Sequence, residues 1–242
     1  TIFKEHLAER AVLKEIIQGY EYVLHTAGHL LLKSEADPFG AIQANVVATT
    51  NVLDACLQSG VRKVVFTSSI SVFGEPSYVP VDEAHPLNNR TFYGATKLFG
   101  EHTCRYYADR GLDYSIIRPY NLYGDRASPK NGAFAQVVPK WIQLILAGEP
   151  IVLYGDGSQL MDLVHVSDMA EAHALALIRR AAGGESFNIG TGISTSAREL
   201  AELLVRAMGV PDHPIEYIPQ DICLVKQRRC DISKARKILG YE

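Results

Sequence analysis

The sequence lacks the features that mark membrane, metal-binding and nucleic-acid-binding proteins. Its uninterrupted apolar stretches are only a few residues long, such as the one that begins at Ile151, whereas crossing a bilayer takes roughly 20 residues. The 4 cysteines form no CxxC pair and no Cys/His cluster of zinc spacing. No run of Lys or Arg accompanies the net charge of -3, so a surface for nucleic acid or an anionic membrane has no electrostatic support. Because no signal-peptide pattern opens the chain either, we expect a cytoplasmic protein that binds a small molecule and no metal.

What the sequence does contain is a regular alternation of short β-branched runs with amphipathic segments. The 242 residues are 47% apolar and 21% charged, which is an ordinary globular composition. Alternating strands and helices are typical of βαβ units around a parallel sheet, so we predict an α/β fold. The expected strands are residues 20–27, 62–68, 112–118, 151–154, 163–166, 186–190 and 215–218. The expected helices are residues 37–59, 93–110, 133–147, 167–181 and 195–208.

The character of the chain changes after Pro119, where a polar loop and shorter elements follow. We therefore place a domain boundary near Asn121. Residues 1–121 are predicted to form a sheet domain. Residues 122–242 are predicted to form mainly a smaller cap, with segments near 163–192 returning to the sheet.

The strongest single candidate site is the YGATK motif, Tyr93 to Lys97, at the start of an expected helix. Residues four apart share a helix face, so the phenol and the ammonium can address the same reactant. A nearby cation favours a phenolate, so we expect Lys97 to lower the pKa of Tyr93 from about 10 toward neutrality and make it a general base. Alone, a Tyr and a Lys at this spacing are equally typical of an ordinary helix surface.

Polar groups at the ends of two expected strands strengthen this candidate. The strand 62–68 runs into TSSISVFG, which places Thr67, Ser68 and Ser69 at the edge where open α/β sheets hold their ligands. A hydroxyl there can pass the proton of a substrate alcohol to a phenolate. The next strand ends in RPYNLYG, where Asn121 offers a sugar hydroxyl both a donor and an acceptor. The alternatives are hydroxyls that merely start a loop and an amide that stabilises a turn.

The chain resembles the extended short-chain dehydrogenase/reductases in the order of its motifs, which are HTAG, TSSISVFG, YGATK, RPYNLYG, YGDGSQ, VHVSD, FNIGTG and DISKARKILG. Within that superfamily it resembles the NAD-dependent epimerase/dehydratase branch typified by the UDP-galactose 4-epimerases. The resemblance covers nearly the whole chain. It implies a Rossmann-type doubly wound parallel sheet with a smaller α/β substrate-binding cap. It also implies bound NAD and a nucleotide-diphosphate sugar, most simply a UDP-hexose. The helices from Asp37 and Tyr93 resemble the pair that forms the family's dimer interface, which implies a homodimer.

The resemblance assigns catalytic and cofactor roles at matching positions. Tyr93 matches the catalytic tyrosine, Lys97 its partner that also binds the nicotinamide ribose, and Ser69 the hydroxyl residue beside the substrate's carbon 4 alcohol. Tyr120 matches a position against the nicotinamide. Asn45 matches an asparagine on the cofactor side, with a buried amide that stabilises its own helix as the alternative. The remaining cofactor positions are Thr26, Ala27, Gly28, Thr67 and Ser68.

The resemblance also implies a set of substrate contacts. Asn121 matches a residue that contacts the sugar diphosphate, beside the roles of Ser69 and Tyr93 at the sugar. Gln136 and Val137 lie where the family's cap helix offers groups to the nucleotide. The remaining positions are Tyr154, where an apolar or aromatic side chain lies against the base, and Arg228, a diphosphate or sugar contact whose alternative is a solvated arginine.

The residues beside Ser69 narrow the expected reaction. Decarboxylases of the family resemble TSEVYG here and 4,6-dehydratases carry an Asp-Glu pair, because elimination needs a further acid and base. Ile70 and Ser71 supply no carboxylate. We therefore expect epimerisation at carbon 4 through a 4-keto intermediate, in which Tyr93 takes the hydroxyl proton and NAD takes and returns the hydride. The alternatives are a 4-keto reductase or a dehydratase of the same family and, from another class, a non-catalytic dinucleotide-sensing or scaffold protein.

The chain departs from the family pattern at two places. Met161 stands where the family commonly has an Arg that grips a phosphate, which shifts that role toward Arg228. No GxxGxxG or GxGxxG occurs among the 19 glycines, although the family opens with a strand, that loop and a helix that holds the pyrophosphate. Residues 1–19 match only the helix before the strand at 20–27. We therefore expect this sequence to be part of a longer protein, with the sheet incomplete at its N-terminal side.

Overall fold

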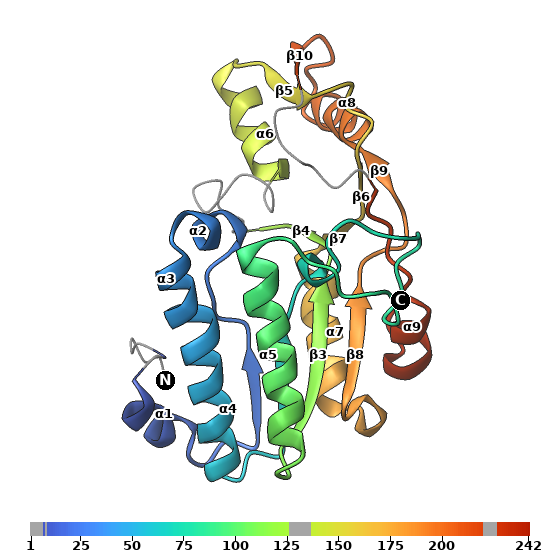
Figure 1. The fold of residues 1–242 in the computed structure, drawn as a ribbon. Helices are drawn as coiled ribbons and strands as arrows, with labels where there is room; N and C mark the ends of the chain where they lie inside the picture. Colours follow the sequence, from blue (N-terminus) through green and yellow to red (C-terminus); the bar gives the residue numbers. More distant parts are fainter. Residues whose placement is uncertain (1–6, 8, 126–136, 220–226) are drawn as a thin grey trace.

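The main element of the structure is a parallel sheet. The computed structural model describes residue 7 and residues 9–125, 137–219 and 227–242. The sheet has 4 strands in the order β1-β2-β3-β8, and each pair is parallel. All of them therefore end at the same edge, which lies at the top of the sheet in Figure 1. The strands are β1 (Tyr22–His25), β2 (Lys63–Thr67), β3 (Asp113–Pro119) and β8 (Glu185–Ile189).

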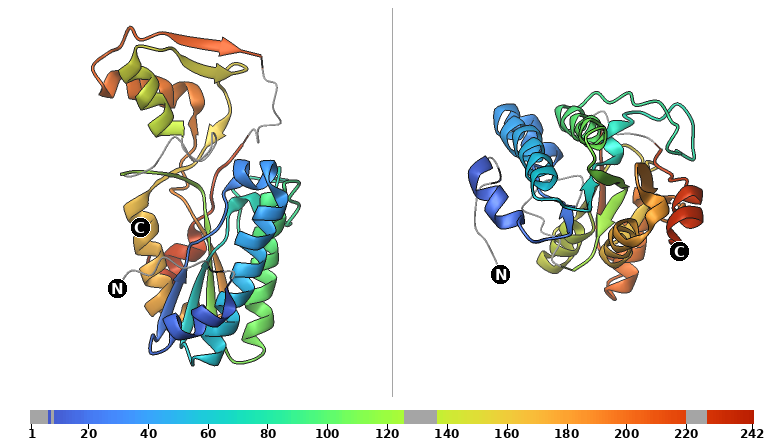
Figure 2. Two further views of the ribbon diagram at one scale, coloured as in Figure 1. Left: turned by 90° about the vertical axis from the view of Figure 1, so that its left-hand side faces the viewer. Right: turned by 90° about the horizontal axis from the view of Figure 1, so that it is seen from below.

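Helices cover both faces of this sheet (Figure 2). Side chains alternate along a strand, so Val64 and Phe66 pack into one apolar cluster with α1, α4 and α5, whereas Val65 packs into another with α7 and α9. A side chain at the end of a strand therefore contacts the helices on the face of the sheet toward which it points. The helices are α1 (Arg10–Ile17), α4 (Ala48–Gln58), α5 (Phe92–Ala108), α7 (Val166–Ile178) and α9 (Ser233–Leu239).

A second group of elements lies beyond the carboxyl edge of the sheet (Figure 1). Its strands β5 and β10 pair in parallel, and α6 and α8 pack around them in a separate apolar cluster. Ser196 and Glu199 form a capping box that starts α8. These elements are α6 (Val137–Ala147), β5 (Ile151–Tyr154), α8 (Ala197–Ala207) and β10 (Ile215–Ile218). The described residues also form two short strand pairs, β4 (Asn121–Tyr123) with β7 (Leu163–His165) and β6 (Leu160–Met161) with β9 (Thr195–Ser196).

The helix expected over residues 37–59 is not continuous. It begins as α3 (Pro38–Ala41), widens into the π-helical segment η1 (Ile42–Val47) and continues as α4. The wider turn carries Asn45, which is buried. π-helical turns are rare and are frequently found at functional sites. The elements that we did not expect are all short: α2 (Leu31–Ala36), η2 (Ile70–Val72), η4 (Arg180–Ala182), β4, β6, β9 and α9.

Candidate active site

The first turn of α5 is fixed at the carboxyl edge of the sheet. Thr91 caps the helix, because its hydroxyl accepts a hydrogen bond from the Gly94 N–H at 3.0 Å. Glu35 of α2 accepts the Tyr93 N–H at 3.1 Å. Farther along, Gly100 lies so close to the Phe66 ring that a Cβ atom would collide with it. The glycine therefore lets α5 pack tightly on β2 and brings its first turns to the ends of the strands.

Tyr93 and Ser69 meet at this edge. The phenol is 8% exposed and is hydrogen-bonded to the Ser69 side chain. Ser69 in turn caps η2: its Oγ accepts the Ser71 N–H at 3.1 Å and lies 3.2 Å from the Ser71 Oγ. Three hydroxyls, those of Tyr93, Ser69 and Ser71, therefore form one hydrogen-bonded chain that can move a proton.

The protonation state of Tyr93 differs from our expectation. Burial raises the pKa of its phenol, and the hydrogen bond with Ser69 offsets only part of this effect. The Lys97 Nζ lies 5.8 Å from the centre of the Tyr93 ring. The expectation that Lys97 lowers this pKa toward neutrality is therefore wrong in direction, because desolvation is the larger effect. Tyr93 is a neutral phenol at pH 7.

Lys97 lies one turn after Tyr93 and reaches the end of β2. Its ammonium donates a hydrogen bond to the Thr67 carbonyl at 2.9 Å and lies 5.3 Å from the centre of the Phe66 ring. Burial lowers the pKa of Lys97 to about 8. A Cβ atom on Gly28, which follows β1, would lie 3.6 Å from the same Nζ. The ammonium therefore occupies the space between the ends of β1 and β2.

A buried ion pair holds α5 against the sheet below these groups. The Glu101 carboxylate is fully buried and accepts two hydrogen bonds from the Arg118 guanidinium, at 2.8 and 2.7 Å. It also accepts the Ser68 hydroxyl at 2.6 Å, so the hydroxyl of this expected cofactor residue is engaged inside the protein. Arg105 lies farther away on the solvent side, at 3.6 Å. One carboxylate thus joins α5 to the ends of β2 and β3.

The stretch after β1 has the properties expected beside a cofactor. Thr26, Ala27 and Gly28 are exposed at the carboxyl end of β1. Gly28 has a φ of +154° and its added Cβ would lie 2.8 Å from the Asn45 Oδ1, so only glycine fits there comfortably.

The Asn45 side chain itself is engaged within the protein. It accepts the His29 N–H at 2.6 Å and donates to the His29 carbonyl and the Thr96 hydroxyl. These hydrogen bonds join η1 to the segment after β1 and to α5 rather than stabilising the helix that carries Asn45.

Tyr120 and Arg228 belong to a different buried cluster. The Tyr120 side chain is 5% exposed, and burial next to Cys230 and Asp162 raises its pKa. Burial lowers the pKa of Arg228, and the nearby Tyr120 and Glu75 partly offset this lowering. In the described part of the chain, neither Tyr120 nor Arg228 forms a hydrogen bond or ion pair with Tyr93 or Lys97.

Asn121 is an expected substrate residue whose side-chain acceptor has no partner among the described residues. Its main-chain N–H donates to the Asp162 carbonyl at 3.1 Å. Its side-chain Oδ1 is buried without a hydrogen-bond partner among the described residues. A buried acceptor left alone is costly, so this atom is suited to receive a ligand donor.

The other expected nucleotide contacts lie in the second group of elements. Val137 starts α6 and packs against that group's apolar cluster, and Tyr154 ends β5 in parallel register with Ile218. Both are partly buried. Gln136 lies outside the described residues.

Sequence reasoning missed three buried polar side chains near the site. Glu101 continues the spacing of Tyr93 and Lys97 on the same face of α5, and this periodicity could have revealed it. Asp162 accepts four hydrogen bonds from the segments after β8 and before α9, through Thr191, Gly192 and Cys230. His173 of α7 bonds to the Thr67 hydroxyl. Nothing in the sequence marks Asp162 or His173 as buried.

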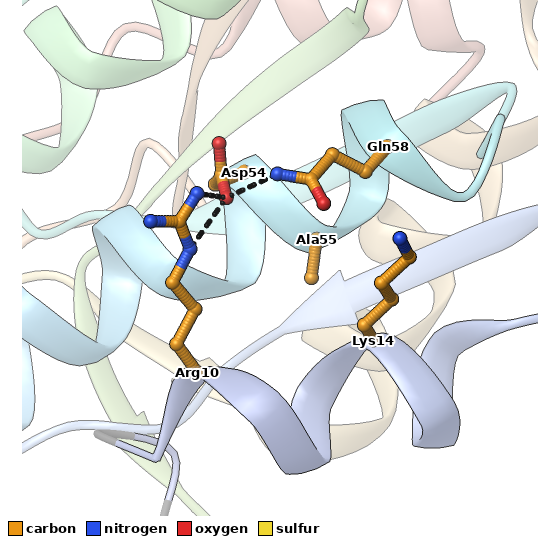
Figure 3. Close-up of a pocket in the computed structure, with 5 residues that line it drawn as sticks. All are labelled: Arg10, Lys14, Asp54, Ala55 and Gln58. Carbon is orange, nitrogen blue, oxygen red and sulfur yellow. Dashed lines mark hydrogen bonds and ion pairs between the residues drawn. The ribbon is translucent and has the colours of Figure 1, made fainter.

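The described residues offer no competing site of comparable chemistry. A surface hollow of about 390 Å³ lies between α1 and α4, and the Arg10–Asp54 ion pair occupies its rim (Figure 3). Within the described ranges, no group of three or more His, Cys, Asp or Glu side chains could hold a metal ion. Nor does any helix in those ranges have the length and apolar character needed to cross a membrane.

Comparison with known proteins identifies the family. Residues 1–190 match the model of the NAD dependent epimerase/dehydratase family. The chain is 39% identical over 226 residues to a UDP-glucose 4-epimerase of Mycolicibacterium smegmatis, covering 92% of this chain and 71% of that protein. The fold matches that of the UDP-glucose 4-epimerase from Thermotoga maritima with UDP-glucose, with a TM-score of 0.92, 29% identity and coverage of 99% and 78% of the two chains. It also matches the Thermus thermophilus UDP-glucose 4-epimerase in complex with NAD, with a TM-score of 0.88, 29% identity and coverage of 99% and 78%. These likenesses confirm the predicted α/β fold with its parallel sheet, and the chain belongs to the NAD-dependent epimerase/dehydratase family.

Proposed function

We propose that this protein is an NAD-dependent isomerase that inverts carbon 4 of a nucleotide-diphosphate hexose, with a UDP-hexose as the first choice. The observation that carries the proposal is the chain of hydroxyls from Tyr93 through Ser69 to Ser71, next to the Lys97 ammonium at the carboxyl edge of a parallel sheet. The relatives named above include UDP-glucose 4-epimerases, one with UDP-glucose and one with NAD.

The residues at the ends of β1 and β2 fit the nicotinamide ribose half of NAD. Thr26 to Gly28 are exposed, Gly28 permits close approach of a ligand to the backbone, and the Lys97 ammonium lies beside it. Lys97 and Tyr93 would hold the ribose hydroxyls, and Thr67 and the segment 26–28 would line the ring. When bound, NAD supplies a reversible hydride acceptor.

The protein's own groups account for the proton transfer. In the neutral state described above, the Tyr93 phenol can donate a proton to a keto oxygen. Acting as the base for a substrate hydroxyl requires a lower pKa, and an additional positive charge near the ring favours that direction. Ser69 lies between the phenol and Ser71, so it can orient the alcohol while its own hydrogen bonds stay satisfied.

Epimerisation is favoured over elimination because the hydroxyl chain contains no carboxylate. The nearby Glu35 side chain accepts the Tyr93 main-chain N–H, and Glu101 is fully buried against Arg118. Neither carboxylate is hydrogen-bonded to Ser69 or Ser71 in the described structure. A dehydratase would need a further acid and base at this place.

For the substrate we propose contacts from both parts of the molecule. The partner-free Oδ1 of Asn121 would accept a donor from the sugar diphosphate, and Arg228 would supply positive charge. Tyr154, Val137 and Gln136 would contact the nucleotide. This assignment agrees with the proposed division into a cofactor domain, residues 1–121, and a mainly substrate-binding domain, residues 122–242.

A homodimer through α5 and its neighbouring helix completes the proposal. Exposed residues of α5 recur at helical spacing on one face, and two of them, Phe99 and Tyr106, are large and apolar, with 41% and 52% exposure. Ala95 and His102 complete this face. A second copy would cover it. We also propose a cytoplasmic location.

The proposed function is tested by a substrate screen. The purified protein with NAD is incubated with UDP-, GDP- and dTDP-hexoses, and the products are identified by proton NMR. We expect interconversion of a carbon 4 pair without net consumption of NAD. Stoichiometric oxidation of NADPH with loss of a 4-keto substrate would instead establish a reductase. Binding of NAD without turnover of any sugar nucleotide would favour a dinucleotide-sensing protein.

A further inference from the structure

Thr67 is contacted by polar side chains from both faces of the sheet. It is the last residue of β2: β1 pairs with β2 only as far as Phe66, and β3 continues the pairing to Thr67 itself. Lys97 of α5 donates to the Thr67 carbonyl at 2.9 Å. The imidazole of His173, on α7 at the opposite face, lies 2.8 Å from the Thr67 hydroxyl (Figure 2). The residue that anchors the ammonium is thus itself tied to a second helix.

The hydrogen bonds of His173 define its tautomer. Its Nδ1 lies 2.8 Å from the Met169 carbonyl, which can only accept, so Nδ1 carries the hydrogen. Burial lowers the pKa of His173 below its ordinary value, which keeps the ring neutral at pH 7. In a neutral imidazole with a protonated Nδ1, the Nε2 is an acceptor. The Thr67 hydroxyl therefore donates to it.

We propose that His173 is a positioning residue: by accepting the Thr67 hydroxyl, it holds the end of β2 so that the Thr67 carbonyl keeps the Lys97 ammonium beside Tyr93. This inference rests on the proposed function of the same site. With the hydroxyl hydrogen directed to α7, the Thr67 oxygen can only accept hydrogen bonds from a ligand. His173 thereby also makes the Thr67 hydroxyl oxygen a hydrogen-bond acceptor, and not a donor, for a bound molecule.

Four variants and one control separate this role from ordinary packing. His173→Phe keeps a ring but removes the acceptor, Thr67→Val removes the donor, and His173→Gln places an amide oxygen near the position of Nε2. The fourth variant combines His173→Phe with Thr67→Val. The control is Ser115→Ala, because the Ser115 hydroxyl also joins the sheet to the α7 region, through the Ala182 carbonyl at 2.6 Å, far from Lys97 along β3.

We expect kcat to fall when residue 173 can no longer accept the hydrogen bond from the Thr67 hydroxyl, and to recover when it can. His173→Phe and Thr67→Val should each lower kcat for the preferred UDP-hexose about fivefold to tenfold, with KM within about twofold, as for the loss of one oriented hydrogen bond. The double variant should be no worse than either single variant, because both remove the same bond. His173→Gln should recover kcat to within about threefold, and Ser115→Ala should leave it unchanged. If His173→Phe does not fold, the kcat values of Thr67→Val and His173→Gln still test whether the hydrogen bond between Thr67 and residue 173 matters.

A spectroscopic readout makes the test independent of turnover. Nitrogen-15 NMR of the histidines at pH 7 should show His173 neutral, protonated at Nδ1, with the Nε2 resonance shifted in Thr67→Val. A His173 protonated at Nε2, or a cationic ring, would overturn the inference, as would unchanged kcat in His173→Phe. If wild-type protein interconverts no sugar nucleotide, the proposed function fails. If it is active and Tyr93→Phe is not, unchanged kcat in His173→Phe counts against the positioning role alone.

Discussion

Burial acts on Tyr93 and Lys97 in the same physical sense, because each side chain loses water that would stabilise its charged form. The pKa of the phenol rises and that of the ammonium falls to about 8. At pH 7 the pair is therefore a neutral phenol beside a cation that still carries most of its charge. Lys97 also donates a hydrogen bond to the Thr67 carbonyl, so its contribution is both electrostatic and structural.

The lowered pKa of Lys97 predicts how stability depends on pH. Between about pH 8 and pH 10.5 the unfolded chain binds more protons at this position than the folded chain, so the free energy of unfolding rises with pH across this window. Lys97→Met removes this dependence. Relative to the variant, wild-type protein should gain about 3 kcal/mol between pH 7 and pH 10.5, measured by urea unfolding.

Other groups titrate in the same window, but they are common to both proteins and cancel in the difference. The matched control is Lys140→Met, which removes a lysine from an exposed position on α6 and is measured under the same conditions. A difference between wild type and Lys97→Met that stays constant with pH would contradict the desolvation of the Lys97 ammonium.

The sequence predicts which residues lie together in the site better than it predicts their protonation. The spacing of YGATK and the hydroxyls after a strand were enough to predict that Tyr93, Lys97 and Ser69 lie together, and the structure brings them together. The direction of the Tyr93 pKa shift could not be predicted, because it depends on how much of the ring α5 and the sheet cover. That quantity belongs to the tertiary structure.

At the scale of elements, α5 is held at its first turn and again near its middle. Thr91 and Glu35 bind the first turn, and two turns later the Glu101 carboxylate binds Arg118 and Ser68. The two attachments fix the position of the helix along the strands. Tyr93 therefore keeps its place relative to Ser69, which lies on a different element.

Removing the charge of Glu101 should strongly destabilise the protein. Glu101→Gln leaves the buried Arg118 guanidinium without its counter-charge, and breaking one side of such a pair typically costs about 3–5 kcal/mol. Urea unfolding followed by circular dichroism measures this loss. Arg105→Gln is the matched control: Arg105 contacts the same carboxylate from a 40% exposed position, and its loss should cost no more than about 1 kcal/mol. Equal effects of the two variants would refute the role given to the buried pair.

The long helices and strands were predictable from the sequence, whereas the short ones were not. The strands and helices with clear alternation or helical spacing lie within a few residues of their expected bounds, as for α5, expected at 93–110 and observed at Phe92–Ala108. β6 and β9 have two residues each, too few for a periodic pattern. The π-helical segment at Ile42–Val47 was also missed: its buried Asn45 is hydrogen-bonded to His29 and Thr96, which are distant in the sequence.

At the scale of the whole molecule, the site lies where two groups of elements meet. The group of elements built on the main sheet supplies Tyr93 and Lys97 from α5 and Ser69 from the segment after β2. The second group lies beyond the carboxyl edge of the sheet (Figure 1). A ligand that spans a dinucleotide site and a nucleotide-sugar site needs both. The partners of Arg228 and Tyr120 were not predictable from the sequence, because they come from distant segments.

The proposed dimer predicts that a charge on the exposed face of α5 separates the two copies. Phe99→Glu should shift the sedimentation coefficient from that of a dimer to that of a monomer, because a carboxylate would be buried against an apolar partner. Leu146→Glu is the control, since this side chain on α6 is 75% exposed outside that face. Monomeric wild-type protein, or a dimer that Phe99→Glu leaves intact, would contradict the assignment.

The most direct test of the central claim is the rate of carbon 4 inversion in Tyr93→Phe, measured by proton NMR on the preferred UDP-hexose with NAD present. The variant loses only the phenolic hydroxyl, so the fold and dinucleotide binding should persist, as circular dichroism and calorimetry can verify. We predict a rate about 10²- to 10⁴-fold below that of wild type, the usual contribution of a positioned acid and base. A rate within about twofold of wild type would show that Tyr93 does not carry the proton and would contradict the account.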